Sequence, residues 1–302
     1  MATTAEFDRF IAIDWSGARA VRTPAIAVAE IMRDGDEVQL VAGPLNGRWS
    51  RQAVADWLVN VTRSARVHGH HTLVGIDANF SYAAEVIAEQ IPNARHVSDL
   101  WAHIERLAGE AENFSGEAVW QHTEMTRFFW HSGPRHADFR IVQRLAEVVC
   151  GEAGHGYPES PFKLIGPKQV GKGGLAIMRL CHCLCETLGE AIAFWPYDPP
   201  ENIARASLVL CEIYPRLFIR KAGLGSAKIR LSDHLDEALV AFGSHVAPMT
   251  ELSDHDSDAI IAAAGMRQAL RETGLPQPPA DLADRIRLEG WIFGLAFQKE
   301  AS

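Results

Sequence analysis

The stretch FIAIDWSGA (10–18) decides the fold, because an apolar run typical of a buried strand ends in a carboxylate, Asp14. An ionised group in that position is costly unless it is paired, hydrogen-bonded or bound to a metal. Two further stretches have the same form, since TLVGIDA ends its apolar run at Asp77 and LVLCEIYP ends its run at Glu212. Three strands that each end in an acid predict a functional cluster rather than unrelated turn or capping residues.

The stretches around these acids predict an α/β fold. RFIAIDWS, TPAIAVAEI and DEVQLVAG are typical of three antiparallel strands, with MRDGD as a turn between the last two. SRQAVADWLVNVTRSARVHG has helical spacing, and TLVGIDA follows it as a fourth strand. Further on, GGLAIMRLCHCLCETLG predicts a helix, AIAFWP and LVLCEIYP predict strands, and SDHDSDAIIAAAGMRQALRETG predicts a long helix. We therefore expect a single domain over residues 1–302 with a mixed sheet, and acids at the carboxyl ends of its strands, where ligands bind in open α/β sheets.

Residues 83–160 interrupt this regular pattern. They are rich in alanine, glutamate, histidine and aromatic residues, with helical stretches such as SDLWAHIERLAGEAE and ADFRIVQRLAEVVCGE. The segment is too long for a loop in a compact domain, so it predicts an inserted helical cap. Within it, FFWHSGPRH (128–136) has residues that could stack bases, although core aromatics followed by a turn are the favoured interpretation.

Composition narrows the class of protein and of partner. The chain has 302 residues, 47% of them hydrophobic and 22% charged, with a net charge of −9. That charge argues against a broad nucleic-acid-binding surface, although basic residues gather locally in KLIGPKQVGK and PRLFIRK. We see no signal peptide and no run long enough to cross a bilayer, and five cysteines do not suggest a disulfide framework. We therefore expect a cytoplasmic protein without a membrane partner, and the sequence leaves its oligomeric state open.

A fourth acid comes from the long predicted helix in SDHDSDAIIAAAG. Ser253 can cap its first turn, with Asp256 three residues on as the capping-box partner. Asp254, His255 and Asp258 are spaced so that they share one face of the helix. Complementing the helix dipole explains Asp254 and Asp256, but it explains poorly an Asp258 that faces the sheet. We therefore expect Asp258 to join the acids at the strand ends.

Carboxylates brought together in this way need a counterion. Two of them roughly 4 Å apart repel by about 4 kcal/mol at an effective dielectric constant of about 20. Hard divalent cations with all-oxygen ligands relieve that repulsion, which favours Mg²⁺ or Mn²⁺ as the cofactor. We expect Asp14, Asp77 and Asp258 to be metal ligands and catalytic residues, with Glu212 as a further ligand or as a base that orients water.

Several residues are candidates for contacting a phosphate-bearing substrate. GPKQVGKGG (166–174) nearly matches a P-loop, but Gly173 stands where a serine or threonine is required, so we reject that motif. A glycine-flexed loop could still bring Lys168 and Lys172 to a phosphate near the acids. The other candidates for binding phosphate or substrate are Ser16, Arg216 and His255.

With these residues identified, the chain resembles the ribonuclease H-like superfamily, in which three antiparallel strands and a helix precede a fourth strand. Asp14, Asp77 and Asp258 match the acids that this superfamily carries on its first strand, its fourth strand and its last helix. AIDWSGA, GIDANFS, FKLIGPKQVGKG, EIYPR, DSDAIIAA and EGWIFG together resemble domain-of-unknown-function family four-two-nine, whose members are predicted nucleases. The resemblance implies a divalent-metal-dependent nuclease or phosphodiesterase, with a short or structured nucleic acid as one substrate class.

Two alternatives from other functional classes stay open. The first is an ATP-dependent phosphotransferase of the actin and sugar-kinase type, because Asp14-x-Ser16-Gly17 loosely resembles the first phosphate loop of that group. No second phosphate loop or adenosine-binding glycine motif accompanies it. The second is a non-catalytic binding protein that keeps the ribonuclease H-like fold and has lost the chemistry.

Overall fold

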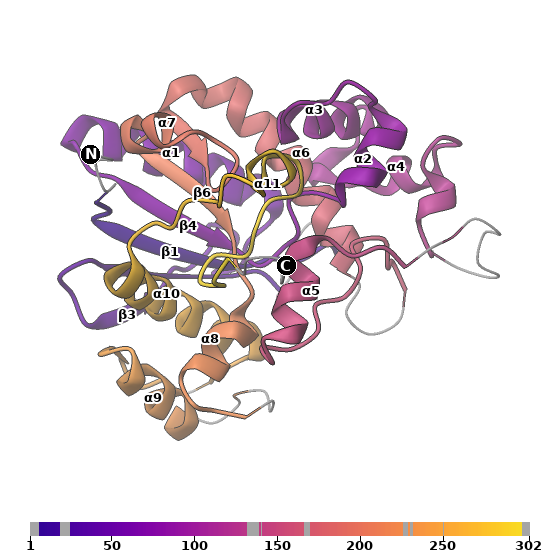
Figure 1. Cartoon of the computed structure of the whole chain (residues 1–302). Helices are drawn as coiled ribbons and strands as arrows, with labels where there is room; N and C mark the ends of the chain where they lie inside the picture. The colour runs from indigo at the N-terminus through magenta and orange to yellow at the C-terminus, as the bar shows by residue number, and fades with distance from the viewer. Residues whose placement is uncertain are drawn as a thin grey trace.

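A mixed β-sheet forms the centre of the computed structural model, which describes residues 6–18, 25–131, 139, 141–165, 170–225, 229, 232–249 and 251–297 (Figure 1). Its strands are β1 (Arg9–Asp14), β2 (Ala27–Met32), β3 (Glu37–Leu40), β4 (Thr72–Ile76), β5 (Ile192–Phe194), β6 (Leu208–Glu212) and β7 (His245–Val246). The helices are α1 (Arg51–His68), α2 (Ala84–Gln90), α3 (Val97–Ala108), α4 (Glu117–Gln121), α5 (Leu145–Glu152), α6 (Val170–Leu188), α7 (Pro200–Arg205), α8 (Pro215–Lys221), α9 (Ser232–Ala241), α10 (Asp254–Thr273) and α11 (Ala283–Glu289). Short 3-10 turns lie at η1 (Glu112–Phe114), η2 (Thr126–Phe128) and η3 (Gly189–Ala191).

The strand order is β5-β6-β4-β1-β2-β3-β7 in the described part of the chain. The first three strands pair antiparallel, whereas β4, β6 and β5 extend the sheet on the other side of β1 in parallel. The predicted α/β class and the opening antiparallel meander are therefore confirmed. The short edge strand β7, which pairs with β3, was not predicted, because two residues carry no periodicity.

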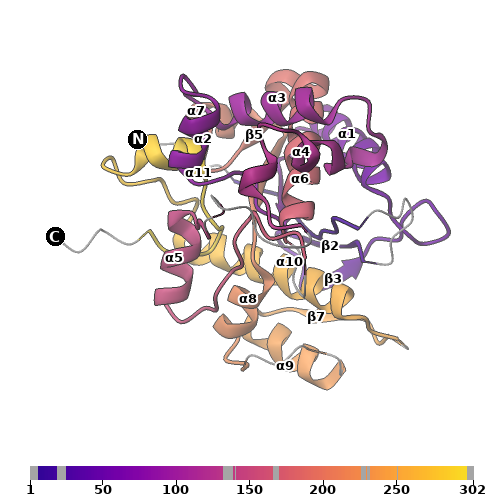
Figure 2. The same cartoon turned by 90° about the vertical axis from the view of Figure 1, so that its right-hand side faces the viewer.

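Helices cover both faces of the sheet, as the two perpendicular views show (Figures 1 and 2). The alternation of side chains along β1 divides its apolar residues between the two layers. Ile11 and Ile13 pack with the helices α1, α3 and α6. Phe10 and Ala12 pack with α8, α9 and α10 on the other face. The sheet is therefore buried on both sides, which is the reason its central strands are almost wholly apolar.

Helix α10 lies close to the sheet and begins near the strand ends. Ser253 accepts a hydrogen bond from the Asp256 N–H at 3.1 Å, and Asp256 bonds back to the Ser253 N–H, so the predicted capping box is confirmed. A side chain at Gly75 of β4 would collide with Met266 of α10, whose sulfur lies 2.5 Å from the position of its Cβ. The missing side chain at Gly75 therefore lets α10 approach the strands that end in acids.

The described residues of the segment 83–160 include the helices α2, α3, α4 and α5, whose extents differ from the predicted helical stretches. In the stretch ADFRIVQRLAEVVCGE, helix α5 begins at Leu145 and residues 141–144 before it are not helical, while residues 137, 138 and 140 lie outside the described residues. In FFWHSGPRH, Phe128 and Phe129 are buried, in agreement with the interpretation of these aromatics as core, whereas residues 132–136, where a turn was expected, lie outside the described residues. Helix α3 packs in the same core as α1 and α6, and the boundaries of a separate cap stay a prediction.

Two further findings concern the described residues as a whole. None of their helices has the length and apolar character needed to cross a membrane. All five cysteines have free thiols, consistent with the absence of a disulfide framework.

Candidate functional site

Asp14 and Asp77 lie side by side at the ends of two neighbouring strands. The register pairs Ile13 with Ile76, and the Asp77 N–H donates to the Ile13 carbonyl at 2.9 Å. Both acids continue the strand positions that face α10, where Phe10 and Leu73 are packed. Parallel pairing of β1 and β4 thus brings together two residues that are far apart in sequence.

Helix α10 adds two further polar groups to this pair. The His255 Nδ1 atom hydrogen-bonds the Asp14 Oδ2 atom, while the Asp14 side chain is almost completely buried. Asp258 lies about one turn further along the helix and is close enough for its charge to affect Asp77. Because the N-terminal end of α10 carries a partial positive charge, it favours the negative groups gathered there.

The pKa of Asp77 is raised well above its usual value of 3.8. Burial is the largest cause, followed by the negative charges of Asp14, Asp258 and Glu212 and by a side-chain hydrogen bond with Asp14. Mutual repulsion of this kind is relieved either by a retained proton or by a bound cation. The four acids found in the sequence therefore form one electrostatically coupled cluster.

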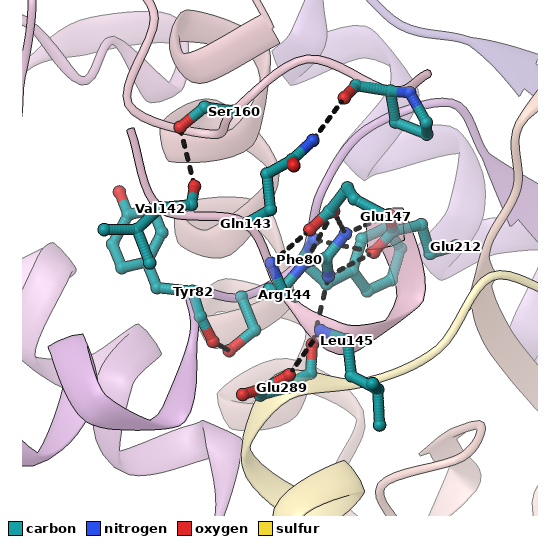
Figure 3. A network of polar contacts seen from close by, with 12 residues as sticks. Phe80, Tyr82, Val142, Gln143, Arg144, Leu145, Glu147, Ser160, Glu212 and Glu289 are labelled. Carbon is teal, nitrogen blue, oxygen red and sulfur yellow. Dashed lines mark hydrogen bonds and ion pairs between the residues drawn. The ribbon is translucent and has the colours of Figure 1, made fainter. Parts of the chain in front are cut away.

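Glu212 belongs to this cluster, but its carboxylate already accepts hydrogen bonds from other residues of the protein (Figure 3). Successive side chains of a strand point to opposite faces of the sheet, and Cys211 packs on the face of Asp14 and Asp77. The side chain of Glu212, the next residue of β6, therefore lies on the opposite face. There it accepts hydrogen bonds from Arg144 Nη1 at 2.8 Å and Nη2 at 2.5 Å, and one from the backbone N–H of Phe80 at 3.2 Å. The role of Glu212 as ligand or base stays a prediction, and any such role must compete with Arg144.

Arg144 is completely buried and was not identified from the sequence. Burial alone would lower its pKa, but the carboxylates of Glu147 and Glu212 raise the pKa well above the usual value. Its Nε atom donates to Glu147 Oε1 at 2.8 Å, and its Nη1 atom donates to the Glu289 carbonyl at 3.0 Å. The Arg144 N–H donates to Glu147 Oε2 at 2.5 Å, but an arginine side chain cannot accept the reciprocal hydrogen bond of a capping box, so no local motif marked this pair in the sequence.

Glu289 is a third buried acid in this network, beside Glu212 and Glu147 (Figure 3). Its Oε2 atom accepts from the Leu145 N–H at 2.8 Å, and its Oε1 atom accepts from the Ala84 N–H at 2.9 Å. A single side chain at the end of α11 therefore ties the starts of α2 and α5 together. The network joins the predicted insertion to the C-terminal part of the chain directly behind the acid cluster.

A cavity of about 800 Å³ opens onto the acids. The predicted site residues that line it are Asp14, Ser16, Asp77, Lys172, Glu212, Arg216, His255 and Asp258. Lys168 lies outside the described residues, so its predicted role stays untested. Lining residues not singled out from the sequence include Asn79, Glu147, Trp120 and Tyr157. These residues belong to segments whose local sequence patterns give no sign that they lie near the strand ends.

The loop after β1 is held tightly against the beginning of α6. The Trp15 Nε1 atom donates to the Gly173 carbonyl at 3.1 Å. A Cβ at Gly17 would lie 2.3 Å from the Gly173 nitrogen and 2.4 Å from the Lys172 carbonyl carbon, so this contact requires glycine. Gly17 thus allows close packing of two backbone segments, which places Ser16 and Lys172 at the same cavity.

Arg51 fixes this loop from the other side. It donates to the carbonyl groups of Ser16 at 3.0 Å, Ala18 at 2.8 Å and Asn113 at 2.6 Å. Burial, together with the charge of Arg179, lowers the pKa of Arg51 to about 10. Its Nε and Nη1 atoms donate to backbone carbonyls, so we assign these donors of Arg51 a structural role.

The donor set of the cluster fits a hard divalent cation, because Asp14, Asp77 and Asp258 all offer carboxylate oxygens. Across the described ranges, however, no group of three or more histidine, cysteine, aspartate or glutamate residues is positioned to hold a metal ion. Burial and the neighbouring negative charges raise the pKa of Asp77, so its carboxyl group keeps its proton more readily than a free aspartate does. Metal binding would therefore involve release of this proton and reorientation of the carboxylates.

Comparisons of the chain with protein-family models, with curated proteins and with solved structures found no match. The resemblance to predicted nucleases rests on the quoted motifs alone. The acid cluster and its cavity are therefore the features of this chain from which a function is inferred.

Proposed function

We propose that this protein is a divalent-metal-dependent phosphodiesterase of the nuclease class. The observation that carries the proposal is the convergence of Asp14, Asp77 and Asp258 from two strand ends and one helix start onto a single cavity. Structural ion pairs also perturb pKa values, but they do so by pairing opposite charges. Here three carboxylates face one another, and such an arrangement is costly unless it serves binding or chemistry.

The proposed fold is ribonuclease H-like. Support comes from the strand order, in which an antiparallel meander is extended by parallel strands on the far side of β1. Support also comes from the places of the acids, because Asp14 ends the central strand, Asp77 follows its parallel neighbour and Asp258 lies on the last long helix. These are the places at which the resemblance noted above expects them.

Asp14, Asp77 and Asp258 would hold the ion, Mg²⁺ or Mn²⁺. When bound, it would lower the pKa of a water molecule and stabilise charge that develops on a phosphodiester. His255 holds the Asp14 carboxylate in place through its Nδ1 atom. Arg144 holds the Glu212 carboxylate in place on the other face of the sheet, and the charge of Glu212 adds to the negative potential that attracts a cation.

The substrate would be phosphate-bearing, as the cations of the cavity indicate. Lys172 from α6 and Arg216 from α8 line the same cavity as the acids, together with the hydroxyl group of Ser16. Cationic side chains beside a carboxylate cluster are suited to hold a phosphodiester against the repulsion of the acids. A local pair of cations also agrees with a net charge of −9, which is unsuited to long electrostatic contacts along a duplex.

The test is a set of thermal melts with and without Mn²⁺, on the wild type and on Asp258→Asn. Binding to the folded state stabilises by about 2.7 kcal/mol at 100 times the dissociation constant, so the wild-type melting temperature should rise. Asp258→Asn should lose most of this rise, while its metal-free form should be no less stable because repulsion falls. Asp256→Asn is the matched control, since Asp256 lies in the same helix turn but does not line the cavity.

Hydrolysis of a small phosphodiester and of oligonucleotides completes the test. Metal-dependent cleavage should fall by orders of magnitude in Asp258→Asn and persist in Asp256→Asn. ATP hydrolysis without phosphodiester cleavage would point to the phosphotransferase instead. Metal binding without either reaction would point to the non-catalytic binding protein. Equal metal-induced shifts in the wild type and Asp258→Asn would remove Asp258 from the site and overturn the proposal.

A further inference from the structure

Part of the cavity wall is aromatic and comes from the segment between β4 and α6. Trp120, at the end of α4, and Tyr157, after α5, both line the cavity that contains the acids, and Pro158 lines it beside Tyr157. Neither aromatic residue takes part in the chemistry proposed above. A stacking function for them therefore adds a property to the site that the acids do not explain.

Tyr157 is the more unusual of the two, because 78% of it is exposed. Its ring is nevertheless supported, since the Cδ1 and Cε1 atoms lie 2.8 and 2.9 Å from where a Cβ of Gly151 would be. A single exposed aromatic residue is ordinary on a protein surface. An exposed ring that rests on backbone and lines a polar cavity is instead a surface on which a flat ligand can stack.

The aromatic surface adjoins a cation of the same cavity. Gly156, next to Tyr157 in the chain, packs against Arg216, whose Cδ lies 3.1 Å from the position of a Cβ at Gly156. Arg216 and Lys172 are the cavity-lining cations proposed above to hold phosphate. The cavity thus holds three features that a nucleotide chain requires. The aromatic ring can stack on a base, the cation can bind a phosphate, and the carboxylate cluster lies where the scissile bond would be.

We infer that Trp120 and Tyr157 stack unpaired nucleobases, so that the site takes single-stranded nucleotide units, such as strand ends or dinucleotides, rather than a base-paired duplex. The inference rests on the proposed function for the identity of the reaction. A cavity of about 800 Å³ falls in the range of pockets that enclose a small ligand. Bases in a duplex are already stacked and paired, so they would have to be extruded before they could reach these rings.

The test measures binding of short oligothymidylate in EDTA, so that binding is separated from metal-dependent cleavage. The comparison ligands are the same backbone with abasic sugars and a blunt hairpin duplex. The wild type should bind the oligothymidylate on the order of 100-fold more tightly than either comparison ligand, which is the scale of two base–aromatic stacking contacts. Tyr157→Ala and Trp120→Ala should each reduce this preference about 10-fold without weakening abasic binding.

Two controls isolate stacking from general disturbance of the cavity. Tyr157→Phe keeps the ring and should keep the preference, and Ile141→Ala changes a 69% exposed apolar residue that does not line the cavity. Trp120 is half-buried, so circular dichroism melts must show that Trp120→Ala folds, whereas exposed Tyr157 provides a variant without that risk. Equal binding of base-bearing and abasic ligands, or no effect of Tyr157→Ala, would overturn the inference. Base-dependent binding in a protein that neither binds Mn²⁺ nor cleaves would overturn only the proposed function.

Discussion

Arg144 and Glu212 form a two-pronged ion pair, in which Nη1 lies 2.8 Å from Oε2 and Nη2 lies 2.5 Å from Oε1. The pair joins the start of α5 to the end of β6, and Arg144 also donates to the Glu289 carbonyl at 3.0 Å. It therefore locks the segment that carries Tyr157 to the strand that carries a cluster acid. The shape of the cavity depends on a contact between residues that local sequence patterns do not relate.

Removing Arg144 should destabilise the fold strongly, because it leaves buried carboxylates without their partner. We expect Arg144→Met to lower the free energy of unfolding by about 3 to 5 kcal/mol, measured by urea denaturation. Combining it with Glu212→Gln should cost less than the sum of the two single changes, because the second removes one of the uncompensated charges. Arg287→Met, at an exposed pair 3.7 Å from Asp284, should change stability by less than about 0.5 kcal/mol. Strict additivity of the two buried changes would show that the pair is not coupled.

The raised pKa of Asp77 predicts a pH dependence of the metal-free protein. The folded state keeps a proton that the unfolded chain releases near the usual value of 3.8, so the native state binds more protons above that pH. The free energy of unfolding should therefore fall as pH rises from about 3.8 through the folded-state pKa of Asp77. Asp77→Asn should remove this part of the decline, as measured by urea melts in EDTA over a pH series. An identical pH slope in the wild type and Asp77→Asn would contradict the shift.

The close approach of Gly17 to α6 predicts a steric effect at the site. Gly17→Ala would place a Cβ 2.3 Å from the backbone nitrogen of Gly173, and backbone cannot move aside as a flexible side chain would. We expect a loss of about 1 to 3 kcal/mol in stability together with weaker Mn²⁺ binding, because the loop carries Asp14 at its base. Gly35→Ala is the control, since its nearest neighbour, Met32, would lie at 3.6 Å. Similar behaviour of the two variants would argue against a tight contact at Gly17.

A phosphate contact by Lys172 predicts a change in salt dependence. Lys172→Ala should raise KM for an oligonucleotide and reduce the slope of its logarithm against the logarithm of salt concentration by about 1. Lys163→Ala is the control, because Lys163 pairs with Glu159 at 3.1 Å and does not line the cavity. An unchanged salt slope in Lys172→Ala would remove that residue from the substrate-binding surface.

The sequence by itself determined the strands and helices whose patterns are local. FIAIDWS and TLVGIDA were identifiable because an apolar run of strand length is followed by an acid, and both strands are present. The helix start at Ser253 was identifiable because a capping box needs only residues three apart. The register of parallel strands then makes neighbours of Asp14 and Asp77, whose placement at strand ends was already evident.

Only the tertiary structure decided what surrounds these acids. It placed β6 between β4 and β5, and it turned Glu212 to the opposite sheet face from Asp77, where Arg144 binds it. It also brought Trp120 and Tyr157 to the cavity from segments whose own sequence shows no relation to the strand ends. The physical reason is the range of the interactions: periodicity and capping act within a few residues. Buried charge pairing and cavity walls arise only when distant segments pack together.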